Sequence, residues 1–430
     1  MSALTRTIAG AIVTALVPVL LPAQPAPVPA LDQFARLQEE LHRTHDGGDT
    51  EAYLAASQAT YAFLNGSPRA TLQLMSAEAA SGKPDDALRS FAEFVAMGQA
   101  NEEVLKAKSF DPLRGLAGYQ RIDAGMAVNA TSKSIANQVF RLESTARVPE
   151  DIDYDPGAKR FYISTVLGRQ ILQVDMAGRT IVFAGSPDQW PMLALKVDSR
   201  RRVLWATEVA LDGFSAAAKA DWGRSAILQY DLHSGKLLHR IEGPPKTSLG
   251  DMTLTANGDP IVSDGEHGGV YRINGSTRQI QRIDGGDFVS PQTPAVLPDG
   301  KHILVPDYVR GIGVLDLATK HVVWIPMAGK YALNGIDGLY AVGDILIATQ
   351  NGTSPERVVR FTYDPSKLGI LAEGIIERAT PTLGDPTHGV VVGDYFYYIA
   401  NSGWDALDDH GNLLEGKSLP ASSVMRAKIN

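Results

Sequence analysis

The sequence predicts a mainly β fold, a six-bladed β-propeller preceded by a small α-helical domain. The main observation is a phrase that recurs about six times between Val148 and the C-terminus: a turn, an apolar strand, a turn with Gly or Asp, and a second apolar strand. Clear copies span residues 252–264 and 295–307. Units of about 45 residues with four short strands are typical of propeller blades. The second observation is helical periodicity in residues 31–126, which separates this stretch from the repeats.

The repeats divide residues 148–430 into six blades, with a five-bladed ring containing one merged unit as the alternative. The second blade carries an insertion, Ala210 to Arg224. Residues 127–147 are interpreted as a connector that has room for the outer strand closing the ring. The predicted blade starts lie near Val148, Pro187, Pro244, Asp287, Gly329 and Ala379.

The helical segment predicts helices near residues 31–41, 50–63 and 87–97, with another beginning at Pro68. Its helix–turn–helix spacing of about 34 residues, with small Ala-rich positions and a Gly-Lys-Pro turn, resembles tetratricopeptide repeats. That resemblance implies a surface that binds peptides. The alternative is a helical extension that only packs on the propeller.

The first 30 residues have the composition of a secretory signal. Arg6 precedes an apolar run from Ile8 to Leu21, which is short for a membrane span, and small residues follow. Cleavage after Ala23 or Ala30 is expected, and an uncleaved membrane anchor is the alternative. The mature chain is therefore predicted to be periplasmic or secreted, without a stable membrane span.

Composition excludes several classes of function. The chain of 430 residues is 44% hydrophobic and 20% charged, with a net charge of -8. This acidic balance argues against nucleic acid as a partner, because nucleic-acid sites need basic patches. The absence of cysteine excludes disulfides, zinc–thiolate sites and a catalytic thiol. No Gly-x-Ser-x-Gly elbow, phosphate-binding loop, His-Glu-x-x-His or dinucleotide fingerprint stands out.

Polar residues gather at two positions of the repeat that meet at one mouth of a propeller channel, the start of the first strand and the end of the second. Carboxylates arranged in a ring repel one another unless a cation lies between them. Oxygen ligands without cysteine favour a hard ion, Ca²⁺ before Mg²⁺ or Mn²⁺. The alternative is ordinary turn chemistry, since Asp before Gly is common in turns. The set comprises Glu150, Asp151, Thr165, Met192, Glu208, Asp251, Asp264, Gln292, Asp307, Asn334, Asp337, Gln350, Asn351, Asp385, His388 and Asn401.

Three phrases, residues 149–156, 197–205 and 336–339, resemble the senescence marker protein/gluconolactonase/luciferin-regenerating-enzyme family. The resemblance covers the propeller and implies a six-bladed, calcium-dependent lactonase or esterase-like hydrolase. It implies Glu150 and Asp337 as metal ligands, and Asp251 as a third if the alignment shifts by one residue. The chain departs from the family at Met192-Leu193, where an Asn ligand is expected and an apolar pair stands instead.

The sixth blade contains Gly384-Asp385-Pro386-Thr387-His388-Gly389, which resembles a phrase of paraoxonase-like six-bladed hydrolases. The resemblance implies that His388 works as a general base near the channel mouth, and Asp385 is the second candidate catalytic residue. In such a mechanism calcium polarises a lactone carbonyl and stabilises the oxyanion, while His388 activates water. The alternative is that His388 caps a loop or packs against Tyr395.

Two functions follow from these patterns. The first is an exported, metal-assisted lactonase or esterase whose substrate is a small molecule at the channel mouth. The second is a non-enzymatic protein that binds a small ligand or, through the helical segment, a protein partner. The candidate substrate contacts at the mouth are Glu208, Asp264, Asp307, Asn334 and Asn401.

Overall fold

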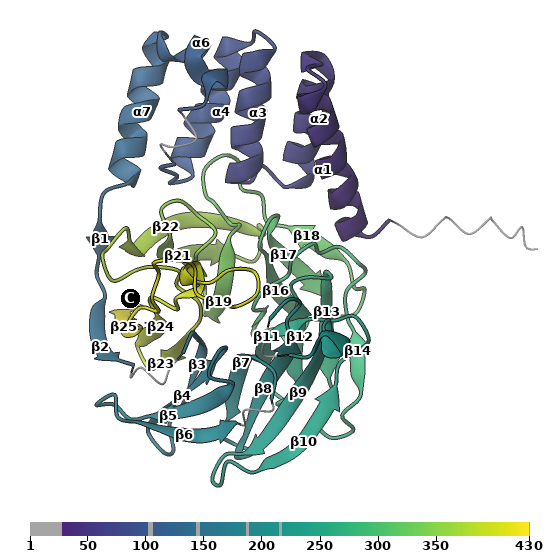
Figure 1. Ribbon diagram of the computed structural model, residues 1–430, viewed down its shortest axis with the longest axis vertical. Helices are drawn as coiled ribbons and strands as arrows, with labels where there is room; N and C mark the ends of the chain where they lie inside the picture. The colour runs from purple at the N-terminus through teal and green to yellow at the C-terminus, as the bar shows by residue number, and fades with distance from the viewer. Residues whose placement is uncertain (1–27, 102–105, 143–146, 186–188, 215–216, 430) are drawn as a thin grey trace, which may run out of the picture.

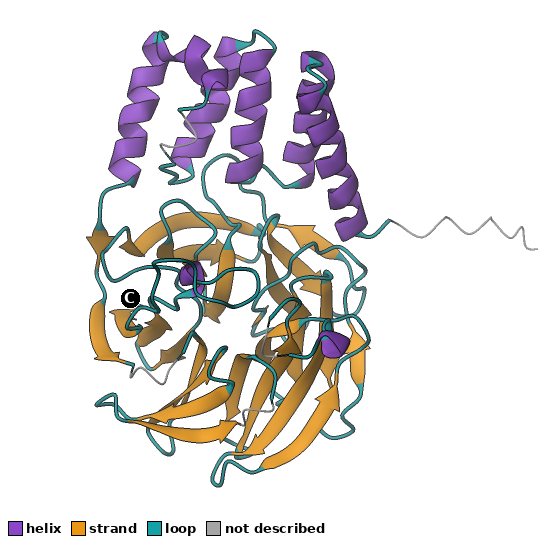
Figure 2. Ribbon diagram, in the orientation of Figure 1, coloured by secondary structure: helices purple, strands orange, loops and turns teal. Residues whose placement is uncertain are grey.

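The computed structural model describes residues 28–101, 106–142, 147–185, 189–214 and 217–429. Within them, six antiparallel sheets form a ring, and a row of helices stands along one side of that ring (Figures 1 and 2). The predicted six-bladed propeller with a preceding helical region is confirmed. The predicted signal sequence lies outside the described residues apart from Val28, Pro29 and Ala30.

The first three blades are simple four-stranded meanders, in which neighbouring strands are also consecutive in the chain. In the second blade, the insertion predicted after Ala210 separates β8 from β9 and contains the short helix η2 (Lys219–Asp221). The strands are β3 (Pro149–Asp155), β4 (Arg160–Thr165), β5 (Gln170–Val174) and β6 (Thr180–Gly185); β7 (Met192–Asp198), β8 (Val203–Ala210), β9 (Arg224–Asp231) and β10 (Leu237–Glu242); β11 (Leu249–Leu254), β12 (Pro260–Asp264), β13 (Gly269–Ile273) and β14 (Ile280–Arg282).

The last three blades include the two strands that close the ring. β2 (Asn137–Arg141) pairs with the C-terminal strand β25, so both ends of the propeller share the sixth blade. β1 (Lys133–Ser134) extends the fifth blade beside β22. The remaining strands are β15 (Ala295–Val296), β16 (His302–Asp307), β17 (Gly311–Asp316) and β18 (Val322–Trp324); β19 (Ile336–Val342), β20 (Ile345–Gln350), β21 (Arg357–Asp364) and β22 (Gly369–Arg378); β23 (Gly389–Val392), β24 (Tyr395–Ile399) and β25 (Ser423–Lys428).

The core of the propeller lies between neighbouring blades. One buried cluster joins Tyr162 and Ile171 of the first blade to Leu195 and Leu204 of the second, and similar clusters join the other neighbouring blades. Residues of one strand alternate between the two faces of a sheet, so each strand contributes to the cluster on either side. This packing holds the six inner strands around a common channel.

The helical segment forms a layer of consecutive helices above the rim near β18, β22 and β1 (Figure 1). Proline occupies the first turn of α3 and of α4, where its missing N–H costs no hydrogen bond. Whether the layer is a tetratricopeptide array stays a prediction. None of the described helices is both long and apolar enough to cross a membrane. The helices are α1 (Ala30–Asp46), α2 (Thr50–Phe63), α3 (Pro68–Ala80), α4 (Pro84–Ala96), α6 (Asp111–Arg114) and α7 (Ala117–Asn129), with η1 (Lys108–Phe110).

Polar contacts fix this layer on the fourth and fifth blades. The Arg310 guanidinium lies 4.2 Å from the ring centroids of both Phe63 and Trp324, and its Nε donates to the carbonyl of Phe63 at 3.1 Å. Asn65 Nδ2 donates to the carbonyl of Ile325 at 2.8 Å. Because these contacts join the end of α2 to the rim, the helices α1–α3 are held close to the propeller.

Candidate metal centre at the channel mouth

The backbone register brings the start of the first strand and the end of the second together in all six blades. This is the arrangement that the sequence predicts for the channel mouth. Cα pairing joins Pro149 to Thr165, Met192 to Glu208, Leu249 to Asp264, Pro291 to Asp307, Ile336 to Gln350, and Gly384 to Asn401.

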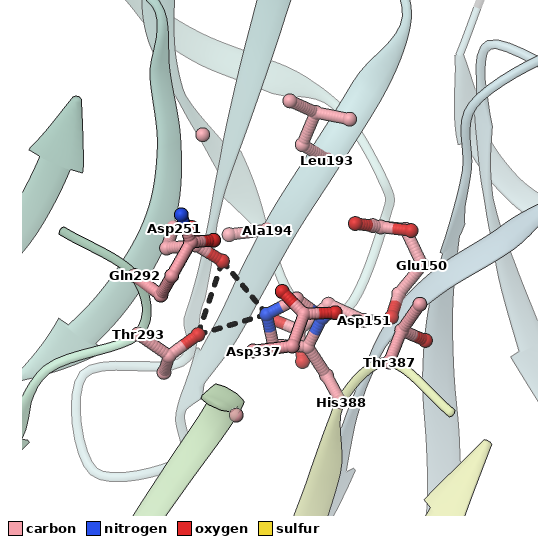
Figure 3. Close-up of polar contacts among 12 residues, drawn as sticks. Glu150, Asp151, Leu193, Ala194, Asp251, Gln292, Thr293, Asp337, Thr387 and His388 are labelled. Carbon is pink, nitrogen blue, oxygen red and sulfur yellow. Dashed lines mark hydrogen bonds and ion pairs between the residues drawn. The ribbon is translucent and has the colours of Figure 1, made fainter. Parts of the chain in front are cut away.

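Three residues of this register, Glu150, Asp337 and His388, converge on one buried point (Figure 3). They come from the start of β3, from β19 and from the residue before β23, so three different blades contribute. One ligand atom from each lies within 4.8 Å of the others. Residues that are remote in the chain thus form a group able to hold a metal ion.

His388 is held by hydrogen bonds at both ring nitrogens. Its Nδ1 lies 3.0 Å from the carbonyl oxygen of Glu150, which can only accept, so Nδ1 donates. Its Nε2 lies 2.7 Å from Asp251 Oδ1 and 2.8 Å from Thr293 Oγ1, whose hydroxyl donates to the same Asp251 oxygen at 3.0 Å. These contacts appear as the dashed triangle in Figure 3. The pattern assigns protons to both nitrogens and a positive charge to the ring.

Electrostatics supports the charged form of His388. Burial lowers the pKa of the imidazole, but the carboxylates of Asp337, Asp151 and Asp251 outweigh burial and raise that pKa well above its usual value. The charged ring therefore partly offsets the negative charge of the surrounding carboxylates, as Lys196 does for Asp151.

The two carboxylates of the group are poorly compensated. Burial and repulsion from Asp337 raise the pKa of Glu150 well above its usual value, although Trp404 Nε1 donates to Glu150 Oε2 at 2.6 Å. Burial raises the pKa of Asp337 to about 7, with Asn351 Nδ2 donating to its Oδ2 at 3.0 Å. Among the described residues, Glu150 Oε1 and Asp337 Oδ1 accept no hydrogen bond. Each carboxylate therefore retains one oxygen for a cation.

These donors fit a metal ion held first by carboxylate oxygens. Both nitrogens of His388 already make hydrogen bonds, so the ring coordinates an ion only after it loses a proton and leaves Asp251. Glu150 and Asp337, the ligands that the family resemblance implies, both belong to the group. The second blade supplies no ligand: the apolar side chain of Leu193 lies there, as the sequence indicates (Figure 3).

Asp251 and Asp385 lie in different surroundings. Asp251 contacts the Nε2 side of His388 rather than forming part of the three-residue group, and its role as a ligand stays a prediction. The Asp385 carboxylate accepts a hydrogen bond from Ser402 Oγ at 3.0 Å, and its backbone N–H donates to Glu356. No hydrogen bond joins Asp385 to His388 among the described residues, and its catalytic role also stays a prediction.

The other residues predicted at the mouth have contacts of their own. Asp264 accepts from the N–H groups of Glu266 and His267 in the following turn. Asp307 accepts four backbone N–H groups, which fix the segments on both sides of β16. These two carboxylates therefore perform the turn chemistry that the sequence leaves open. Glu208 pairs with Arg240 at 2.7 Å, and Asn401 pairs with Gly384.

Three neighbours of the group, Tyr308, Thr293 and Trp404, are not among the residues that the sequence places at the mouth. Asn351, which the sequence does place there, holds Asp337, and the Tyr308 hydroxyl donates to Asn351 Oδ1 at 3.0 Å. Thr293 follows Gln292 in the fourth-blade position, so a repeat alignment shifted by one residue finds it. Trp404 comes from the long irregular segment between β24 and β25, where no repeat marks it.

Comparison with known proteins finds similar solved structures but no matching family. No protein-family model matches the chain, and no curated protein matches it. Several solved structures are similar to it at low identity. A PQQ-bound aldose sugar dehydrogenase from Streptomyces coelicolor has 11% identity and a TM-score of 0.47, covering 69% of this chain and 98% of its own. A gluconolactonase from Xanthomonas campestris has 16% identity and a TM-score of 0.47, covering 70% and 93%. A virginiamycin B lyase from Staphylococcus aureus has 15% identity and a TM-score of 0.44, covering 70% and 100%.

Proposed function

We propose that this protein is an exported, metal-assisted hydrolase that opens a lactone or a similar ester at the channel mouth. The observation that carries the proposal is the convergence of buried Glu150, Asp337 and His388 within 4.8 Å. A protein that only needs a stable ring gains nothing from placing two poorly compensated carboxylates at one buried point. Export rests on the apolar run from Ile8 to Leu21.

The residues of the group divide the work. Glu150 and Asp337 would hold the ion, and Trp404 and Asn351 fix the orientation of these two carboxylates. When bound, the ion supplies a Lewis acid that polarises the carbonyl of the substrate. Calcium is the first candidate because oxygen ligands dominate, and the nearby imidazole makes Mn²⁺ and Zn²⁺ the ions to test beside it.

His388 handles the proton. His388 would release the proton from Nε2 and keep the one that Nδ1 donates to the Glu150 carbonyl. Neutral His388 then accepts a proton at Nε2 from the attacking water and returns it to the leaving alkoxide. Water adds across the acyl–oxygen bond, and the products are one carboxylate and one hydroxyl.

Hydrolysis of a lactone panel tests the proposal. Protein treated with a chelator is assayed alone and after addition of Ca²⁺, Mn²⁺ or Zn²⁺. We expect one ion to restore hydrolysis, and Asp337→Asn to lower it by about 100-fold or more, since one electrostatic contact to the transition state is worth that much. Asp155→Asn, which changes a buried carboxylate outside the group, is the matched control. Equal rates with ion and with chelator contradict the proposal.

The second candidate function is binding without catalysis, and the helical layer favours it. If the chain binds an ion tightly but opens no lactone or ester, the metal group is structural and this second function stands. Binding through the helical layer is then tested directly. The intact protein should retain a partner, and a variant with substitutions on the exposed faces of α1–α4 should not.

A further inference from the structure

The residues that line the channel mouth are polar in five blades and apolar in the second. The polar ones include Glu150, Asp251, Thr293, Asp337 and His388 (Figure 3). The second blade presents Leu193 in the same register. Leu193 lies on β7, which runs next to β3, because the N–H of Leu195 donates to Asp151 Oδ2 at 2.9 Å. The polar mouth therefore has one apolar sector, and this sector borders the blade that carries Glu150.

Two insertions extend the apolar sector over the first blade. The insertion between β8 and β9 carries Leu211 and Phe214. The segment between β24 and β25 carries Trp404 and Leu407. The two insertions are in contact, since the ring centroids of Phe214 and Trp404 lie 6.0 Å apart in an edge-to-face arrangement. Together with the second blade they form one apolar surface, the mouth wall, which consists of Leu193, Leu211, Trp404 and Leu407.

The mouth wall is partly open to solvent. Behind it, Val148, Val166 and Phe214 are buried and form its base. Leu193 and Trp404 are half-buried, so part of each side chain is accessible. Covering accessible apolar surface with an apolar group is favourable, because both surfaces leave water. The wall therefore has surface that a ligand at the mouth can cover.

Trp404 joins the mouth wall to the metal group. Its Nε1 donates to Glu150 Oε2 at 2.6 Å, so the single polar atom of the indole is already paired. The remaining ring atoms are apolar surface. The position of the ring is fixed by the edge of Phe214 and by the short helix η3 (Trp404–Ala406) in which Trp404 lies. A substrate whose carbonyl lies at Glu150 therefore has the wall within reach of its substituents.

We infer that the mouth wall binds an apolar substituent of the substrate, so that the site prefers alkyl-substituted lactones and esters to polyhydroxylated sugar lactones. The choice of substrate class rests on the proposed function. An alkyl chain gains free energy when Leu193 and Leu407 cover it. The hydroxyls of a sugar would lose hydrogen bonds to water against the same side chains. Leu193 is thus a specificity-determining residue, at the position where the family resemblance implies an Asn ligand.

Calorimetric titration of the intact protein with two lactams tests the inference. Lactams resist hydrolysis, so they report affinity even if no lactone is opened. The probes are 2-pyrrolidinone and 5-butyl-2-pyrrolidinone, each titrated with Ca²⁺ and with chelator. We expect the butyl compound to bind about tenfold or more tightly in both conditions, a factor that two buried methylene groups supply.

Substitutions of Leu193 locate the binding. Leu193→Asn replaces an apolar side chain by a polar one of similar size, and it should reduce the preference for the butyl compound to about threefold or less. Leu193→Met keeps the apolar contact and should retain the preference. Leu238→Asn, which changes a leucine of β10 that is 41% exposed, is the matched control. Thermal unfolding shows whether each variant is folded, and the wild-type comparison stands if Leu193→Asn is not.

Two results overturn the inference: equal affinity of the wild-type protein for the two lactams, or a preference that Leu193→Asn leaves unchanged. Failure of the proposed function looks different. If the lactams bind with the expected preference but no lactone is opened, the mouth wall stands and the hydrolase fails. If γ-butyrolactone and γ-octalactone are opened with equal kcat/KM, the hydrolase stands and the inference fails.

Discussion

Glu150 and Asp151 are both buried at the start of β3, and Asp153 is half-buried two residues later, yet their surroundings differ. Asp151 accepts from Lys196 Nζ at 2.5 Å and from the N–H of Leu195 at 2.9 Å. Asp153 accepts from the N–H of Val197 at 2.6 Å. These bonds join the inner strand of the first blade to that of the second. Glu150 has a single hydrogen bond to its carboxylate, from Trp404, and otherwise faces Asp337 and His388.

The difference shows how a structural carboxylate is distinguished from a functional one in this ring. Burial is common to both, so burial alone carries no functional meaning. What separates them is the number of donors. Asp151 and Asp153 accept hydrogen bonds from strand β7, whereas Glu150 and Asp337 come from different blades, lie close to each other and to His388, and each keep one oxygen without a donor among the described residues. Substitution of either kind of carboxylate tests this difference.

The largest expected effect belongs to Asp151→Ala. The change leaves Lys196 without its partner in a nearly buried position, and removing one member of a buried pair costs about 3–5 kcal/mol. Urea unfolding measures the loss. Asp405→Ala is the control: the side chains of Asp405 and of its partner Lys417 are both more than half exposed, so a loss of less than about 1 kcal/mol is expected. A loss below about 1 kcal/mol for Asp151→Ala contradicts the structural role assigned here.

The second prediction concerns pH in the presence of chelator. The pKa of Asp337 is about 7 in the folded chain and near 3.8 in the unfolded chain, so the folded state binds more protons between these values. The contribution of this group to the free energy of unfolding therefore falls as pH rises from about 4 to 7, by up to about 1 kcal/mol per pH unit. The raised pKa of His388 acts in the same direction above pH 6.5.

Denaturant unfolding at several pH values measures this slope, and Asp337→Asn should flatten it. Added metal ion should reverse it, because an ion binds the deprotonated carboxylates and competes with protons. A metal-free protein that becomes more stable between pH 5 and pH 7, by an amount that depends on Asp337, has a charged and well-compensated carboxylate there. That outcome argues against a cation site.

A smaller effect is expected for Asp337→Asn at pH 8 without metal ion. Removing one of two mutually repelling buried carboxylates should stabilise the fold by about 1 kcal/mol, the opposite sign to Asp151→Ala. Thermal unfolding in chelator measures it. Destabilisation by more than about 2 kcal/mol means that Asp337 has a structural role like that of the β3 aspartates.

The smallest effect is expected for Asp385→Asn. Its carboxylate is held by Ser402 and lies apart from the three-residue group, so the response of the melting temperature to metal ion should be unchanged. Hydrolysis should change by less than about threefold, a difference under 1 kcal/mol. A loss of hydrolysis as large as that caused by Asp337→Asn supports the catalytic role that the sequence motif implies for Asp385.

The repeat pattern was sufficient to predict the blades, because alternating apolar strands and Gly- or Asp-containing turns follow from local chemistry. It also placed Glu150 and Asp337 at one mouth. It could not separate them from Asp264 and Asp307, which occupy similar repeat positions but cap backbone N–H groups. That distinction depends on which donors the neighbouring blade presents, and the repeat itself does not encode them.

Trp404 and the contacts of the helical layer show a second limit. Trp404 reaches Glu150 from an irregular segment, and Arg310 contacts Phe63 only because α2 lies against the rim. Periodicity describes each element separately and gives no information on such contacts. The loop sequences allow these contacts, but tertiary packing determines whether they form.

Anomalous diffraction from crystals soaked in Mn²⁺ shows whether Glu150 and Asp337 hold a cation. One strong peak is expected within about 2.6 Å of an oxygen of Glu150 and an oxygen of Asp337. The peak should be absent from Asp337→Asn crystals and present in Asp155→Asn crystals. No peak at the mouth in crystals that show Mn²⁺ elsewhere, or a peak that survives Asp337→Asn, contradicts the proposed metal centre.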